Sequence, residues 1–90
     1  MGGEKMARSF SAWKAWAVVK LLALKVKYRD DKRVAQAVDI LVNRLERLRL
    51  DSLASFLADL HRASVDAPEF LSILPSAEEV EEWFRRGEDE

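Results

Sequence analysis

Several residue types that form metal sites or covalent cross-links in small proteins are rare in or missing from this 90-residue chain. There is no cysteine, which excludes disulfides and thiolate ligands, and the single histidine, His61, cannot supply the usual zinc site. Threonine is absent, and Asn43 and Gln36 are the only side-chain amides, beside 34% charged residues. This bias resembles the composition of thermophilic proteins. So short a chain must be held together by apolar packing, completed in some proteins by a second chain.

Helix-breaking residues are confined to the two ends of the chain. Glycine occurs at 2, 3 and 87 and proline at 68 and 75, so residues 4–67 contain neither. Strands would need turn residues in that stretch, whereas the Ala, Leu, Arg, Lys and Glu found there favour helix. We therefore predict an all-α protein, a small bundle of about four helices, three main ones plus a short C-terminal one. It would form a single helical domain over residues 1–90, with frayed ends at about 1–6 and 87–90.

The first predicted helix begins between Met6 and Ser11, capped by Ser9 or Ser11, and runs to about Arg29. At 100° per residue, one apolar stripe contains Phe10, Trp13, Ala17, Leu21, Leu24 and Tyr28. A second stripe on the opposite side contains Ala12, Ala15, Val19, Leu22, Ala23 and Val26. A helix that is apolar on two sides is expected to be buried on two sides. It is therefore either the central helix of the bundle, where we expect it, or it packs its own chain on one side and a partner on the other.

The remaining helices follow from caps and spacing. A second helix begins at Asp30-Asp31 and is apolar on one side only, at Val34, Ala37, Val38, Leu41, Leu45 and Leu48. A break at residues 50–52 would start a third helix from about 52 to 62, although one bent helix stays possible. After a short turn at residues 66–71, Ser76 and Glu79 form a capping box for a last helix that ends at Gly87. We expect this last helix to bury Ala77, Val80, Trp83 and Phe84.

We find no motif for catalysis. His61 lies near a predicted helix end, where interaction with the helix dipole explains it, and no glycine-rich phosphate loop is present. We predict a non-enzymatic protein with neither cofactor nor metal. Lys14, Lys20, Lys25 and Lys27 interrupt the first apolar segment. We therefore expect no signal peptide or membrane span, and a cytoplasmic location.

Charge is distributed unevenly along the chain. Residues 1–50 contain twelve Lys and Arg and five Asp and Glu, a net charge of +7, whereas residues 51–90 contain three and eleven, a net charge of −8. The two halves can neutralise each other on folding, or the basic half can bind nucleic acid. The candidate phosphate-binding residues are Lys25, Lys27, Arg29, Lys32, Arg33, Arg44 and Arg47.

The leading hypothesis is a protein–protein interaction or assembly module, a homodimer or the small subunit of a complex. The partner would cover the second stripe of the first helix, at Val19, Leu22 and Val26, with Trp16 at its edge. The alternative is a nucleic-acid-associated protein that uses the basic residues given above.

Overall fold

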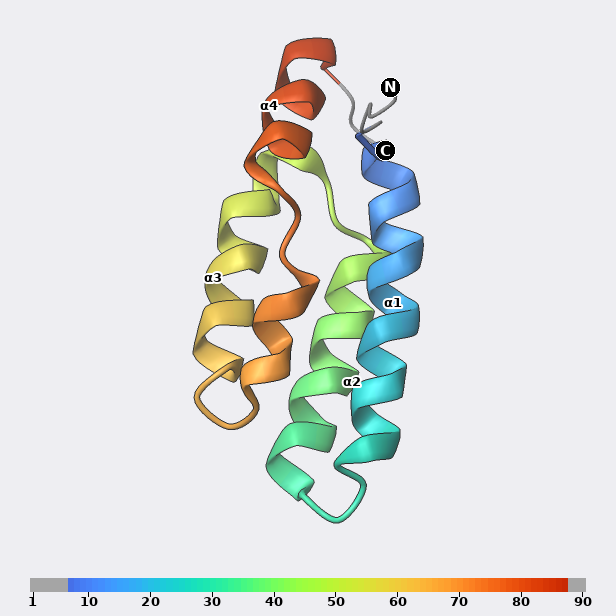
Figure 1. Cartoon of the computed structure of the whole chain (residues 1–90), viewed down its shortest axis with the longest axis vertical. Helices are drawn as coiled ribbons and strands as arrows, with labels where there is room; N and C mark the ends of the chain where they lie inside the picture. The colour runs from blue at the N-terminus through green and yellow to red at the C-terminus, as the bar shows by residue number, and fades with distance from the viewer. Residues whose placement is uncertain (1–6, 88–90) are drawn as a thin grey trace, which may run out of the picture.

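The computed structural model describes residues 7–87, in which helices follow one another without any strand (Figure 1). The elements are α1 (Phe10–Lys27), α2 (Lys32–Glu46), η1 (Leu50–Ser52), α3 (Leu53–Ala63), η2 (Pro68–Ile73) and α4 (Ala77–Arg86). The two labelled η are 3-10 segments. This arrangement confirms the predicted all-α bundle. Of the ends predicted to fray, only Gly87 lies within the described residues.

The helix ends follow the caps that the sequence predicts. The Ser9 hydroxyl accepts a hydrogen bond from the Ala12 N–H at 3.0 Å, and the Asp31 carboxylate accepts from the N–H groups of the first turn of α2. Ser76 and Glu79 form the capping box of α4. Gly87 ends α4 with φ +69°, a left-handed conformation that side chains disfavour.

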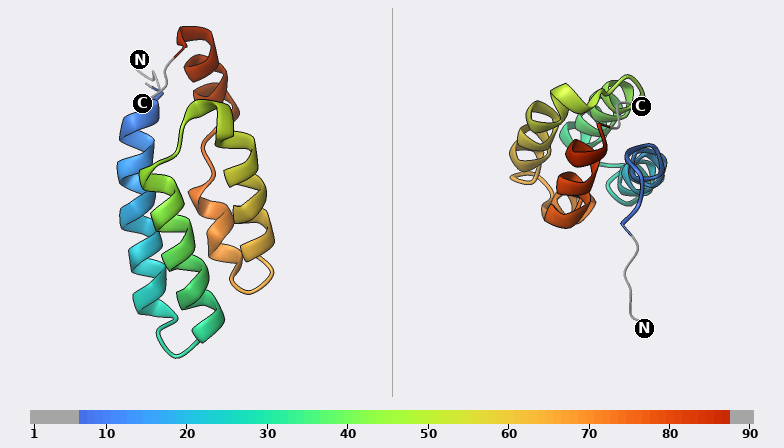
Figure 2. Two further views of the ribbon diagram at one scale, coloured as in Figure 1. Left: turned by 180° about the vertical axis from the view of Figure 1, so that it is seen from behind. Right: turned by 90° about the horizontal axis from the view of Figure 1, so that it is seen from above.

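The chain makes two hairpins and a final helix. Helix α1 and helix α2 lie side by side, α3 and η2 form the second pair, and α4 lies at one end of the bundle, beyond the end of α3 (Figures 1 and 2). Helix α2 ends at Glu46, and buried Leu48 and Leu50 carry the chain into α3. The second and third helices are therefore separate, and the single bent helix left open by the sequence is not formed.

Aromatic side chains from distant elements meet at the centre of the core. Trp13 of α1 is fully buried, and its ring centroid lies 5.5 Å from that of Trp83 and 6.1 Å from that of Phe56. The ring of Phe10 adds a tilted contact with Trp83 at 5.1 Å. The indole N–H of Trp13 donates to the Ile73 carbonyl at 3.0 Å, which satisfies the one polar atom of that side chain.

Helix α1 packs its own chain on one side only. The stripe that includes Phe10, Trp13 and Leu21 is buried, as predicted. On the opposite side, Val19 is 64% exposed and Val26 is 69% exposed. Figure 2 shows that α1 lies at the edge of the bundle. Of the two predicted alternatives, a helix enclosed by its own chain on both sides is therefore wrong, although α1 does supply the centre of the core.

The buried side of α4 differs from the prediction. Trp83 is buried and Val80 is half-buried, but Ala77 is exposed and Phe84 is 56% exposed, so these two expected core positions are wrong. Glu79 is only 5% exposed. The cause is a contact between the two ends of the chain, because α4 turns Glu79 and Trp83 towards Arg8.

Arg8 and Glu79 form a partly buried, bidentate ion pair. The guanidinium donates to the two carboxylate oxygens at 2.6 and 2.9 Å, and the Arg8 backbone N–H donates at 3.1 Å. These hydrogen bonds from Arg8 lower the pKa of Glu79 from 4.5 to about 2, against the effect of burial. The indole N–H of Trp83 donates to the Arg8 carbonyl at 2.7 Å, which fixes the same junction a second time.

We expect the junction between Arg8 and Glu79 to make stability depend on pH. Because the pKa of Glu79 is lower in the folded state, its contribution is fully present above about pH 4.5 and is lost as the pH falls towards 2. Glu79→Gln should lower the free energy of unfolding at pH 7 by about 3 kcal/mol. It should also make the free energy of unfolding depend less steeply on pH below pH 4.5. Urea unfolding across this pH range, with exposed Glu81→Gln as the control, measures both effects. Equal curves for the two variants would contradict this assignment.

Candidate functional site

One face of α1 is apolar along its length and open to solvent. We call it the outward face, and it consists of Ala12, Ala15, Val19, Leu22 and Val26. All five side chains are classed as exposed, and they follow one another at intervals of three or four residues, which places them on one side of the helix. The predicted interface residues Val19, Leu22 and Val26 are therefore brought together on one surface.

The lysines of α1 lie at the edges of this face and turn towards their own chain. Lys25 pairs with Asp39 of α2 at 2.7 Å, and Lys27 pairs with Glu69 of η2 at 2.6 Å. Lys14 donates to the Leu48 carbonyl at 3.1 Å. Lys20 Nζ lies 5.8 Å from the centroid of the Trp16 ring, within the range of a cation–π contact. No charged residue occupies the outward face itself.

The solvent-exposed side of α2 differs in composition from the outward face of α1. Its exposed residues are mostly charged or polar, namely Lys32, Arg33, Gln36, Asp39, Asn43, Glu46 and Arg47, with Ile40 as the apolar exception. In a chain that is 34% charged, the uncharged outward face of α1 is therefore unlike its neighbour. Exposed apolar residues that are contiguous, rather than single, mark interaction surfaces.

Trp16, predicted at the edge of the interface, is less exposed than the residues of the outward face. It is half-buried, and the Arg8 guanidinium carbon lies 4.5 Å from its ring centroid. Trp16 thus borders the outward face with its ring partly covered by cations. The more exposed aromatic is Phe84 of α4.

The predicted basic cluster is divided by the fold. Five of its members lie at the turn between α1 and α2, namely Lys25, Lys27, Arg29, Lys32 and Arg33. Arg44 and Arg47 lie at the other end of α2, about 20 Å away for a 15-residue helix. The seven residues therefore do not form one continuous patch.

Four of the seven cations make ion pairs within the chain. Besides the two lysine pairs above, Arg33 lies 3.6 Å from Asp66, and Arg44 pairs with Asp59. Three of the four acidic partners belong to the acidic half, residues 51–90, so part of the charge asymmetry is neutralised internally. Among residues 7–87, no ion pair or hydrogen bond of the side chain is found for Arg29, Lys32 or Arg47.

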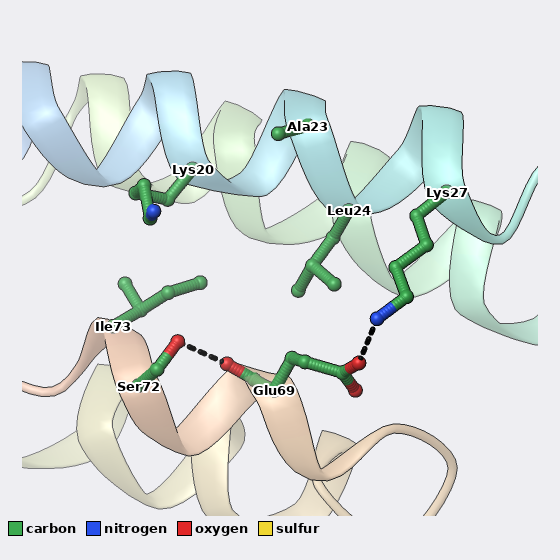
Figure 3. A pocket seen from close by; sticks show the side chains of 7 residues that line it. All are labelled: Lys20, Ala23, Leu24, Lys27, Glu69, Ser72 and Ile73. Carbon is green, nitrogen blue, oxygen red and sulfur yellow. Dashed lines mark hydrogen bonds and ion pairs between the residues drawn. The ribbon is translucent and has the colours of Figure 1, made fainter.

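A shallow pocket of about 150 Å³ lies between α1 and η2 (Figure 3). Its lining brings together Lys20, Ala23, Leu24, Lys27, Glu69, Ser72 and Ile73. Sequence reasoning missed this pocket, because it joins residues more than 40 positions apart.

Glu69 is the centre of charge in this pocket. Its carboxylate accepts hydrogen bonds from Lys27 at 2.6 Å and from the Tyr28 hydroxyl at 2.7 Å, which lower its pKa to about 2. The same contacts raise the pKa of Lys27 and of Tyr28. The contacts with Lys27 and Tyr28 therefore keep the Glu69 carboxylate ionised at neutral pH.

The described part of the chain contains neither a metal-binding cluster nor a membrane-spanning helix. No group of three or more His, Cys, Asp and Glu side chains is arranged to hold a metal ion. No helix there is long and apolar enough to span a bilayer. Comparison of the sequence and structure with protein families, curated proteins and solved structures found no match.

Adjacent leucines of α1 offer a matched test of which side is core. Leu21 is fully buried and Leu22 is 47% exposed. We expect Leu21→Ala to lower the free energy of unfolding by about 3 kcal/mol, because it leaves a cavity. Leu22→Ala should cost less than about 1 kcal/mol in dilute solution. Urea unfolding followed by tryptophan fluorescence measures both, and comparable losses would show that the outward face belongs to the core.

Proposed function

We propose that this protein is a non-enzymatic interaction module that binds a partner protein through the outward face of α1. The observation that carries the proposal is the uncharged, exposed stripe that runs from Ala12 to Val26, beside lysines that turn away from it. A helix face of this kind is typically covered by a helix of another chain.

Internal packing supports this reading, because the bundle is complete without the stripe. Every buried side-chain polar atom among the described residues has a hydrogen-bond partner, and the aromatic core is formed by the inward residues of α1. The outward residues Val19, Leu22 and Val26 thus remain available for binding. Full burial of such side chains contributes roughly 1.5–3 kcal/mol each, enough for a moderate interaction once the cost of association is subtracted.

Nucleic-acid binding is the alternative, and it has less support. Arg29 and Lys32 are the exposed cations at the α1–α2 turn that make no ion pair among the described residues, and Arg47 lies at the far end of α2. Three phosphate contacts would give a slope of log affinity against log salt of about −3, whereas all seven cations would give about −6.

Fluorescence anisotropy with duplex and single-stranded probes decides this alternative. We expect no detectable binding at about 50 mM salt, where electrostatic association is still strong. Binding with a slope of about −3 or steeper, reduced by about one unit in Arg29→Gln, would replace the proposed function with nucleic-acid binding.

Site-specific photo-crosslinking in native cells tests the proposed function directly. A photoreactive amino acid at Val26 should form a discrete protein adduct, because that position would lie against the partner. The same amino acid at Gln36, on the solvent side of α2, is the control and should form none. Adducts of equal yield at both positions, or at neither, would contradict an interface on the outward face.

A further inference from the structure

We propose that the occupant of the outward face is a second copy of this chain, with the two α1 helices packed as a parallel two-stranded coiled coil. The inference rests on the proposed function and goes further by naming the partner and the packing. It is carried by the period of the outward stripe, by the residue types at its positions and by the side chains at its edges.

The outward stripe repeats with a period of 3.5 residues. From Ala12 to Val26, four intervals of 3, 4, 3 and 4 cover 14 residues. The inward stripe from Phe10 to Leu24 also covers 14 residues in four intervals, of 3, 4, 4 and 3, so the mean spacing does not distinguish the two sides of α1. A mean spacing of 3.5 residues with strict alternation of 3 and 4 is the pattern of the seam between two supercoiled helices. The outward stripe therefore fits such a seam.

Residue types along the stripe favour two parallel helices. In heptad notation, Ala12, Val19 and Val26 occupy a positions, and Ala15 and Leu22 occupy d positions. A β-branched residue at a with leucine at d is the combination that favours a parallel dimer. A helix that packs here in parallel must carry the same alternation, and α1 of a second copy does so.

The flanking positions are compatible with the same arrangement. In a parallel pair, each g position lies beside the following e position of the other helix. Val18, which is half-buried, would then contact Ala23 of the second copy, and Ser11 would contact its Trp16. Lys25 occupies the last g position, where its Asp39 partner already balances its charge. The seam thus gains apolar contacts at its edges without bringing unpaired lysines together.

The size of the contact sets the expected strength. Helix α1 has 18 residues, about 27 Å, and contributes two heptads, with alanines at the N-terminal end. Such an interface belongs to the small class, below about 1,200 Å² in total. We therefore expect a reversible dimer with a dissociation constant in the micromolar range. A net charge of −1 for the chain does not oppose association.

Because the chain contains no cysteine, each single-cysteine variant has one thiol, and any disulfide must join two molecules through that thiol. Ala15→Cys and Leu22→Cys place single thiols at successive d positions, about 10 Å apart along the helix. In a parallel pair each thiol faces its own counterpart within disulfide range, so under mild oxidation both variants should form covalent dimers rapidly. Gln36→Cys on the solvent side of α2 is the control and should react only at the slow rate of random collision.

Light scattering with a matched pair of leucine variants supplies the second measurement. Leu22 is 47% exposed on the outward face, and Leu71 is 41% exposed on η2. At about 100 μM the native chain and Leu71→Glu should have the mass of a dimer, whereas Leu22→Glu should be mostly monomeric, with Kd raised at least about a thousandfold. Circular dichroism confirms that both variants are folded.

The outcomes separate this inference from the proposed function. Crosslinking of only one of the two d-position thiols would overturn the parallel arrangement in favour of an antiparallel one. A monomeric native chain, with neither thiol reacting faster than Gln36→Cys, would overturn the second copy as partner. The proposed function would then still be judged by the photo-crosslink at Val26, where an adduct with another protein would sustain it.

Discussion

The rest of the structure depends on the burial of Trp13. Its ring contacts Phe56 of α3 and Trp83 of α4, and its N–H donates to the Ile73 carbonyl at the end of η2, so one side chain joins α1 to three other elements. Because Trp13 must point inward, the residues on the other side of α1 point outward, with Leu22 directly opposite and Val19 and Val26 beside it. The open apolar face is thus a geometric consequence of how the core is built, and no further element among residues 7–87 covers it.

A second junction lies beside this aromatic core, where α4 meets the segment before α1. Glu79 and Trp83 of α4 hold the Arg8 side chain and backbone, so the segment before α1 is tied to the last helix. The guanidinium of Arg8 also covers part of the Trp16 ring. Arg8 therefore contacts both α4, through Glu79 and Trp83, and the border of the outward face, through Trp16.

Local signals in the sequence were sufficient for the elements and for the composition of the outward face. Ser9, Asp31 and Ser76 mark helix starts through hydrogen bonds within one turn, and helical periodicity alone places Leu22 opposite Trp13. The sequence could not predict that Glu79 is buried, because its partner Arg8 is 71 residues away. The exposure of Phe84 follows from the same rotation of α4. Likewise, only tertiary structure shows that Lys27 is paired with Glu69 and that Arg44 lies far from Arg33.

The central claim is that the outward face of α1 lies against its counterpart in a second molecule. Isotope-filtered NMR on a mixture of labelled and unlabelled chains tests it most directly, because it detects only contacts between molecules. The account predicts intermolecular NOEs among the methyl groups of Val19, Leu22 and Val26, and none from Val65, which is exposed elsewhere. Absence of these NOEs at a concentration where the chain is dimeric would contradict the account, and NOEs centred on Val65 would place the contact on another surface.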